Sequence, residues 1–301
     1  MSIDLTGRVA IVTGAGGGLG RCHALALARR GAMVVVNDLG GARDGTGGSA
    51  TAAELVVEEI RAMGGDALAN VASVTDMAEV EAMVAEAIGR WGRIDILVNN
   101  AGILRDKTFA KLDLADFRAV LDVHLMGSVH CTKAVWNLMR EQNYGRVIYT
   151  SSSTGLFGNF GQSAYGAAKL ALVGLMNTLR EEGRRNNIRV NCISPNAATR
   201  MTGDVLDEEI LEALDPSKVS LAVVALAAED APDGVILGAG AGSFERSYIT
   251  LTRGLVLGAS EDVPGQIIDR WDEISDRADE MIPTTGFDQA RHEVARGSGQ
   301  A

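Results

Sequence analysis

RVAIVTGAGGGLG, residues 8–20, is the stretch that decides the fold of this chain. It begins as a short run rich in β-branched residues and ends as a glycine turn, which leads into RCHALALARRG, residues 21–31. β-branched residues favour a strand, glycine allows a tight turn, and alanine and leucine favour a helix. A strand, a glycine turn and a helix in this order are typical of the first half of a βαβ unit.

The same alternation continues along the chain. Further strands are expected at residues 32–38, 66–74, 94–102, 145–152, 188–195 and 233–242, and helices at residues 49–65, 76–92, 114–141, 164–180, 202–214 and 216–230. Strands that are apolar throughout and alternate with helices indicate a parallel sheet covered on both faces. We therefore expect an α/β fold, a single doubly wound Rossmann domain with a seven-stranded parallel sheet, over residues 1–258. Residues 259–301 should form a helical extension with one amphipathic helix at 265–281 and a frayed end.

The composition excludes several classes of protein. A net charge of −11 argues against nucleic acid or an anionic membrane as a partner, and no apolar run reaches the length of a membrane span. Cys22, Cys131 and Cys192 are widely spaced in apolar patterns, so we expect buried thiols in a reducing compartment. The four histidines lack the paired spacing that would suggest zinc. We expect a cytoplasmic protein without a bound metal ion.

The glycine turn predicts a dinucleotide site. Gly14, Gly18 and Gly20 have the spacing G-x-x-x-G-x-G, which provides a tight turn and lets a pyrophosphate approach a helix N-terminus. Asp38 ends the next strand, where its carboxylate can accept hydrogen bonds from ribose hydroxyls and would repel a 2′-phosphate. No lysine or arginine lies within residues 15–19, so we expect NAD rather than NADP. The alternative is that Asp38 is only a turn or cap residue.

A second stretch, SSSTGLFGNFGQSAYGAAK at residues 151–169, carries groups suited to acid–base chemistry. Tyr165 and Lys169 are four residues apart, so a helix would place them on one face. A nearby cation favours a phenolate and lowers the pKa of a phenol from its usual value of about 10. Ser152 could hydrogen-bond a carbonyl or alcohol oxygen. The alternative is a small-residue helix with one tyrosine and one lysine on its surface.

These motifs together resemble the short-chain dehydrogenases/reductases. TGAGGGLG (13–20), NNAG (99–102), Ser152 and YGAAK (165–169) match that family in order and spacing, over residues 8–242. Within it, DVHLMGSV (122–129) and NCISPNAATRMT (191–202) resemble the (3R)-hydroxyacyl-CoA dehydrogenase units of type 2 peroxisomal multifunctional enzymes. Related bacterial enzymes act as 17β-hydroxysteroid or steroid side-chain acyl-CoA dehydrogenases.

The resemblance implies roles for individual residues. Tyr165 would be the catalytic acid/base, Lys169 would lower its pKa and hold the nicotinamide ribose, and Ser152 would orient the substrate oxygen. The cofactor-binding residues that the resemblance implies are Gly14, Gly18, Leu19, Gly20, Asp38, Ser73, Val74, Asn100, Ala101, Gly102, Tyr165, Lys169 and Thr199.

Three positions depart from the usual pattern of the family. His124 stands where most members have an asparagine that assists a proton relay, so it is a candidate catalytic residue or a packed core residue. Ala72 stands where members of the family often have an aspartate near the adenine. Ser73 or the backbone would then have to contact the adenine instead. Pro195–Asn196 replaces the usual Pro-Gly, in front of the loop that carries Thr199.

The activity that the resemblance implies is NAD-dependent oxidation of a 3-hydroxyacyl-CoA, with Arg105, Lys107, Lys111 and Arg200 as candidates to meet the substrate's phosphates. A 17β-hydroxysteroid dehydrogenase and a 3-oxoacyl carrier-protein reductase are alternatives, although Asp38 opposes the NADPH of the reductase. A catalytically silent cofactor-binding protein is a further alternative. The apolar stretches LMGSVHCTKAVWNLM and LALVGLMNTL suggest a subunit interface, so we expect a homodimer or homotetramer.

Overall fold

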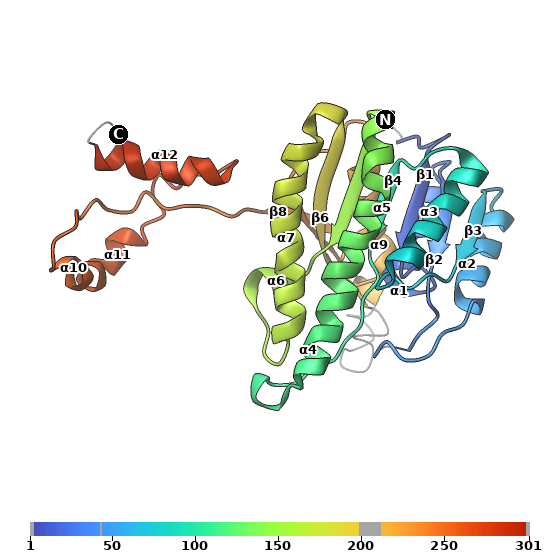
Figure 1. Cartoon of the computed structure of the whole chain (residues 1–301), viewed down its shortest axis with the longest axis horizontal. Helices are drawn as coiled ribbons and strands as arrows, with labels where there is room; N and C mark the ends of the chain where they lie inside the picture. The colour runs from blue at the N-terminus through green and yellow to red at the C-terminus, as the bar shows by residue number, and fades with distance from the viewer. Residues whose placement is uncertain (1–2, 43, 199–211, 299–301) are drawn as a thin grey trace. The chain divides into compact units, whose positions relative to one another are not determined.

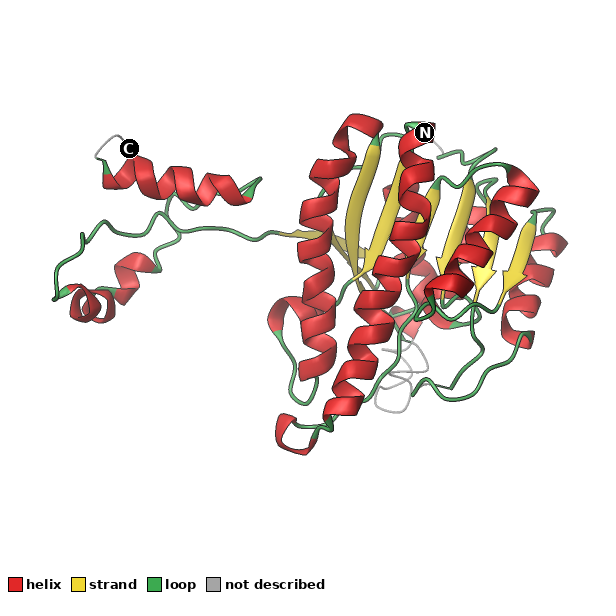
Figure 2. Ribbon diagram, viewed as in Figure 1, coloured by secondary structure: helices red, strands yellow, loops and turns green. Residues whose placement is uncertain are grey.

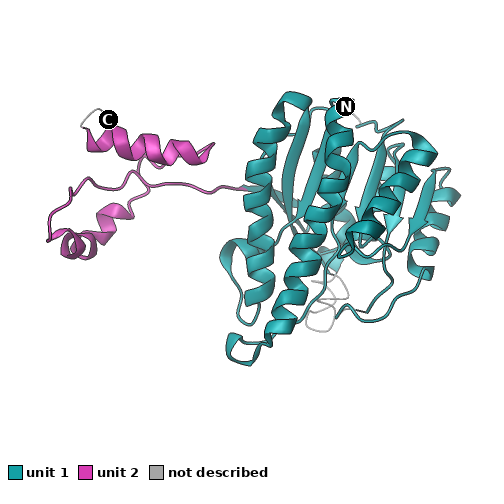
Figure 3. Cartoon of the chain, viewed as in Figure 1, with its two compact units in different colours: residues 1–246 teal, residues 247–301 magenta. Residues whose placement is uncertain are grey.

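The computed structural model of the protein describes residues 3–42, 44–198 and 212–298. The chain divides into two compact units, residues 1–246 and residues 247–301, which are described separately below (Figure 3). The boundary placed at residue 258 from the sequence stays a prediction. Residues 199–211 lie outside the described part of the chain, and with them Thr199, Arg200 and most of the helix expected at 202–214.

The first unit is built on one sheet with the strand order β3-β2-β1-β4-β5-β6-β7-β8 (Figures 1 and 2). The strands are β1 (Val9–Thr13), β2 (Met33–Asn37), β3 (Ala67–Asn70), β4 (Ile96–Asn99), β5 (Gly145–Thr150), β6 (Ile188–Asn196), β7 (Ile236–Gly240) and β8 (Ser243–Ser247). Neighbouring strands from β3 to β7 pair in parallel. The doubly wound Rossmann fold expected from the sequence is confirmed.

The expected count of seven strands is wrong by one, because β8 adds an eighth strand at the edge. Its sequence, SFERS, has no apolar alternation, and four of its five residues are exposed. An edge strand needs no buried face, so hydrophobic pattern does not reveal it.

Helices cover the sheet on both faces. They are α1 (Gly18–Ala28), α2 (Thr51–Ala62), α3 (Met77–Trp91), α4 (Leu114–Leu121), α5 (Gly127–Gln142), α6 (Ser153–Phe157), α7 (Ser163–Gly183) and α9 (Pro216–Ala227). Side chains of β1 alternate between two buried clusters, with Ala10 and Val12 in one and Val9 and Ile11 in the other. The first cluster includes residues of α1, α2 and α9, and the second includes residues of α3, α5 and α7. This alternation explains why the strands are apolar throughout.

The helices of the second unit differ from those expected from the sequence. The amphipathic helix expected at 265–281 is two short helices, α10 (Val263–Asp269) and α11 (Trp271–Ile274). Ile268 and Trp271 are exposed, so little burial supports a longer helix here. The end expected to fray forms α12 (Gly286–Gly297), which begins with a capping box between Thr285 and Asp288. Within the described residues, no helix has the length and apolar content that a membrane span requires.

Candidate active site

The glycine turn between β1 and α1 is locked to the segment that follows β4. Gly14 has φ +64°, and a side chain there would lie 2.8 Å from Ala101 Cα. A side chain at Gly20 would lie 2.1 Å from Gly14 O. Asn100 Nδ2 donates to Thr13 O at 2.9 Å and to Gly14 O at 3.1 Å. The glycines therefore allow a close backbone approach that leaves the N-terminus of α1 open to an anion.

Thr13 completes this junction and was missed from the sequence. Its Oγ1 accepts hydrogen bonds from Asn100 N and Ala101 N, both at 3.0 Å. A threonine at the end of a β-branched strand looks like one more strand residue. Only the pairing of β1 with β4 reveals its second role.

Asp38 follows β2 and is held by backbone amides on both carboxylate oxygens. Oδ2 accepts from Gly16 N and Oδ1 from Gly40 N, each at 2.7 Å. A side chain at Gly16 would lie 2.8 Å from Asp38 Cγ, so this glycine is needed for the contact, although the expected set did not include it. Each oxygen keeps a further lone pair, and the carboxylate can still accept from hydroxyl groups.

Ser73 and Val74 lie in the segment after β3. Ser73 Oγ is 2.8 Å from Thr75 Oγ1, and Ser73 N donates to Glu79 Oε2 at 2.7 Å. Val74 is buried, and its carbonyl is 2.9 Å from His130 Nδ1. The same edge of the sheet thus carries Asp38, Ser73, Val74 and Asn100, as the parallel topology requires.

Ser152, Tyr165 and Lys169 come together at the carboxyl end of β5. Ser152 caps α6 by accepting a hydrogen bond from Thr154 N at 3.2 Å. Tyr165 and Lys169 lie one turn apart on α7, and Lys169 Nζ lies 5.5 Å from the centroid of the Tyr165 ring. Ser151 Oγ donates to Lys169 O at 2.9 Å, which joins the strand end to α7. The helix and the face expected for Tyr165 and Lys169 are both present.

Burial governs the protonation of this group. Burial raises the pKa of Tyr165 above its usual 10, while a hydrogen bond with Ser152 acts in the opposite direction. Burial lowers the pKa of Lys169 from 10.5 to about 7. The ammonium donates to Thr150 O at 2.5 Å. The pKa of Tyr165 is therefore raised by burial, and not lowered as the sequence suggested.

His124 lies inside a π-helical turn, residues Asp122–Met126, between α4 and α5. Its Nε2 is 2.8 Å from Ile103 O and 3.1 Å from Ile103 N, and its ring meets the Tyr165 ring edge-on at 5.2 Å. The side chain is 2% exposed, and burial lowers its pKa to about 3. A side chain at Gly102 would lie 2.4 Å from His124 Cε1. The imidazole is therefore neutral at physiological pH and tightly enclosed.

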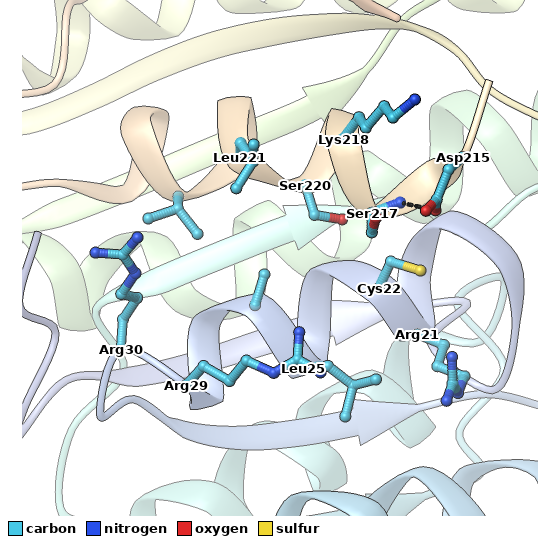
Figure 4. A pocket seen from close by; sticks show the side chains of 12 residues that line it. Arg21, Cys22, Leu25, Arg29, Arg30, Asp215, Ser217, Lys218, Ser220 and Leu221 are labelled. Atoms are coloured by element: carbon cyan, nitrogen blue, oxygen red, sulfur yellow. Dashed lines mark hydrogen bonds between the residues drawn. The ribbon is translucent and has the colours of Figure 1, made fainter. Parts of the chain in front are cut away.

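A cavity of about 440 Å³ lies elsewhere, between α1 and α9 (Figure 4). Its lining includes Arg21, Arg29 and Lys218 together with the apolar side chains of Leu25 and Leu221. Cys22, expected to be a buried thiol, is only partly buried and also lines this cavity. Among the described residues, none of those expected to bind the cofactor or to act in catalysis lines it.

Comparison with known proteins identifies the family. The sequence profile of the short chain dehydrogenase family matches residues 8–210. The chain is 49% identical over 273 residues to a short-chain type dehydrogenase/reductase of Mycobacterium tuberculosis, covering 89% of this chain and 94% of that protein. It is 47% identical over 282 residues to peroxisomal multifunctional enzyme type 2 of Mus musculus, covering 93% of this chain but only 38% of the mouse enzyme.

A solved structure of 7α-hydroxysteroid dehydrogenase, in complex with NADH and 7-oxo glycochenodeoxycholic acid, superposes with a TM-score of 0.71. Its sequence is 31% identical, and the match covers 80% of this chain and 95% of that one. The chain belongs to the short-chain dehydrogenase family. As a short-chain dehydrogenase it is an oxidoreductase.

Proposed function

We propose that this chain oxidises a 3-hydroxyacyl-CoA to the 3-oxoacyl-CoA with NAD. The observation that carries the proposal is the side-chain hydrogen bond between Ser152 and Tyr165, with the buried Lys169 one turn further along α7. Ser152 orients the substrate oxygen, and Tyr165 in its phenolate form takes the hydroxyl proton, becoming a phenol, as hydride leaves carbon 3. NAD, when bound, accepts that hydride. The site contributes by holding the reacting groups at near-attack distance.

The shifted pKa values define what Lys169 does. Burial makes the ammonium of Lys169 costly, and a nearby negative charge stabilises it. The protonated form of Lys169 is therefore favoured when Tyr165 is a phenolate. Burial also disfavours the phenolate of Tyr165, and the positive charge of the Lys169 ammonium stabilises that phenolate. Lys169 therefore promotes proton transfer during turnover, although the resting pKa of Tyr165 is high.

The preference for NAD rests on Asp38. Its carboxylate is fixed by Gly16 N and Gly40 N and can accept from both ribose hydroxyls, whereas a 2′-phosphate would meet its negative charge. The remaining cofactor contacts are assigned to Gly14, Gly18, Leu19, Gly20, Ser73, Val74, Asn100, Ala101, Gly102 and Thr199, with Tyr165 and Lys169 at the nicotinamide ribose.

His124 is assigned a positioning role. Burial lowers the pKa of His124 to about 3, so the imidazole that contacts the backbone of Ile103 is not protonated near pH 7. It can hold the segment after β4 against the edge of the Tyr165 ring. Of the two alternatives that the sequence left for His124, the proposal therefore favours a packed residue over a catalytic one.

The acyl-CoA assignment is supported by the similarity to the mouse multifunctional enzyme and by charge. Arg105 and Lys107 both bind Asp116, at 3.0 and 2.8 Å, so two cations share one carboxylate. Lys111 lies in the adjacent turn, η1 (Phe109–Lys111). These three cations suit substrate phosphates, although the phosphates would have to compete for them with Asp116 and with the nearby Asp106 and Asp113.

A hydroxysteroid is the second candidate substrate, because a structural relative is named as a 7α-hydroxysteroid dehydrogenase. The 3-oxoacyl carrier-protein reductase alternative is disfavoured by Asp38. We further propose a homodimer or homotetramer that forms through α5 and α7. The cytoplasm remains the expected compartment, although the mouse relative is named as peroxisomal.

The test is an absorbance assay of NAD and NADP reduction at 340 nm with purified protein. The substrates are a series of (3R)-hydroxyacyl-CoA esters, their (3S) epimers and a panel of hydroxysteroids. Turnover of the (3R) esters with NAD supports the proposal. Turnover of hydroxysteroids alone would replace the substrate assignment, and a preference for NADP would refute the role given to Asp38.

A further inference from the structure

The segment directly after Asp38 is folded back on itself. We call residues 39–42 and 44–49 the glycine loop. Its two arms are joined by backbone hydrogen bonds from Ser49 N to Leu39 O at 3.0 Å and from Ala42 N to Thr46 O at 2.7 Å. These hydrogen bonds give the loop a defined shape.

The far end of the glycine loop contacts the segment after β4. A side chain at Gly45 would lie 3.0 Å from Ile103 Cγ2, so the loop backbone packs closely on Ile103, which is buried. Arg105 Nε donates to Asp44 O at 3.1 Å. The glycine loop follows β2 in the chain and contacts the segment that follows β4. Because β1 lies between β2 and β4 in the sheet, the loop crosses the carboxyl end of β1.

Arg105 is also fixed from its other side. Its Nη1 donates to Asp116 Oδ1 at 3.0 Å, and Lys107 Nζ donates to the second oxygen of the same carboxylate at 2.8 Å. Arg105 therefore ties a carbonyl of the glycine loop to α4. Lys107 has the same carboxylate partner, and among the described residues its hydrogen bond goes to Asp116 alone.

We propose that Arg105 is a positioning residue that latches the glycine loop across the proposed dinucleotide site and slows release of the dinucleotide. The inference rests on the proposed function in one respect, that the ligand is a dinucleotide. This dinucleotide would lie between Asp38 and Asn100, across the end of β1. To leave, that ligand requires the loop to lift, and lifting breaks the contact of Arg105 with Asp44 and uncovers Ile103. Arg105 then controls the rate of opening rather than the recognition of the ribose.

The test is stopped-flow measurement of NADH release, by fluorescence and without any acyl-CoA, so that a role of Arg105 in substrate binding does not contribute. Arg105→Ala should release NADH about fivefold faster, the factor that corresponds to one hydrogen bond of ordinary strength. Gly45→Ala keeps Arg105 but adds a side chain at φ +89° against Ile103, and it should act in the same direction. Arg118→Ala removes an exposed arginine of α4 with no assigned role; it is the matched control and should release NADH at the wild-type rate.

Amide hydrogen exchange of residues 39–42 and 44–49 in the free protein separates the latch from the cofactor assignment. Arg105→Ala should raise exchange there, and Arg118→Ala should not. Unchanged exchange in Arg105→Ala, or NADH release at the wild-type rate, overturns the latch. A wild-type protein that binds no NADH, while exchange responds to Arg105→Ala, overturns the cofactor assignment and supports the latch.

Discussion

Replacing Lys169 with methionine should stabilise the protein near pH 7 while it abolishes activity. The Lys169 side chain is 3% exposed, and Nζ donates to Thr150 O. Among the described residues it forms no ion pair with a carboxylate, and burial lowers its pKa from 10.5 to about 7. Methionine has a similar length and no charge to desolvate, so the substitution removes the cost of burying a cation.

The magnitude follows from the pKa. One pKa unit corresponds to about 1.4 kcal/mol, so a pKa of about 7 instead of 10.5 costs roughly 4 kcal/mol of stability at pH 7. The variant loses the hydrogen bond to Thr150 O, which offsets about 1 kcal/mol. We therefore expect Lys169→Met to raise the free energy of unfolding by roughly 3 kcal/mol at pH 7.

The pH dependence gives a sharper test. Between pH 7 and 10.5 the unfolded chain keeps the Lys169 proton and the native chain does not, so the wild type gains stability as pH rises. The advantage of the variant, measured by urea unfolding at pH 7, 8 and 9, should shrink by about 1.4 kcal/mol per unit. The buried Cys131 thiol, whose pKa is raised to about 12, titrates in both proteins and cancels in the difference. Parallel stability curves, or a variant less stable at pH 7, would refute the reasoning.

Three further predictions concern the cofactor, His124 and the substrate. Asp38→Ala should weaken NAD binding and shift the preference towards NADP, because the charge that repels a 2′-phosphate is gone; cofactor titrations that show an unchanged preference would remove Asp38 from the ribose site. His124→Gln places a neutral amide near the position of Nε2 and should retain most of kcat with an unaltered pH profile, whereas His124→Phe should lose at least about tenfold. Loss of a limb of the pH profile in His124→Gln would make His124 an acid–base group. Neutralising Lys107 and Lys111 together should raise KM for an acyl-CoA in a salt-dependent manner and leave KM for a hydroxysteroid unchanged; equal effects on both substrates would indicate damage to the fold.

The sequence predicted the elements that carry strong periodicity. The strands and helices of the first unit follow from apolar runs separated by glycine and polar turns, and the parallel order places Asp38, Asn100 and Ser152 at one edge. β8 was not predictable in this way, because an exposed edge strand has no hydrophobic signal. α12 was missed as well; it begins with a capping box and has no buried residue.

Within the site, the residue types were predictable and their electrostatics were not. The spacing of Tyr165 and Lys169 gives a shared helix face, but the depth of burial that shifts both pKa values depends on α6 and the end of β5. Gly16 was hidden in a run of three glycines, and Thr13 in a run of strand residues. Their roles come from contacts with Asp38 and Asn100, which lie far away in the sequence.

The central claim is that Tyr165 transfers the proton in NAD-dependent oxidation of a hydroxyl group. Single-turnover hydride transfer, followed at 340 nm with saturating NAD and a (3R)-hydroxyacyl-CoA, tests it most directly by comparing wild type with Tyr165→Phe. Phenylalanine keeps the ring against His124 and removes only the hydroxyl, so the rate should fall by about 10²–10⁴. A rate close to that of the wild type would show that Tyr165 does not transfer the proton, and the proposed mechanism would be wrong.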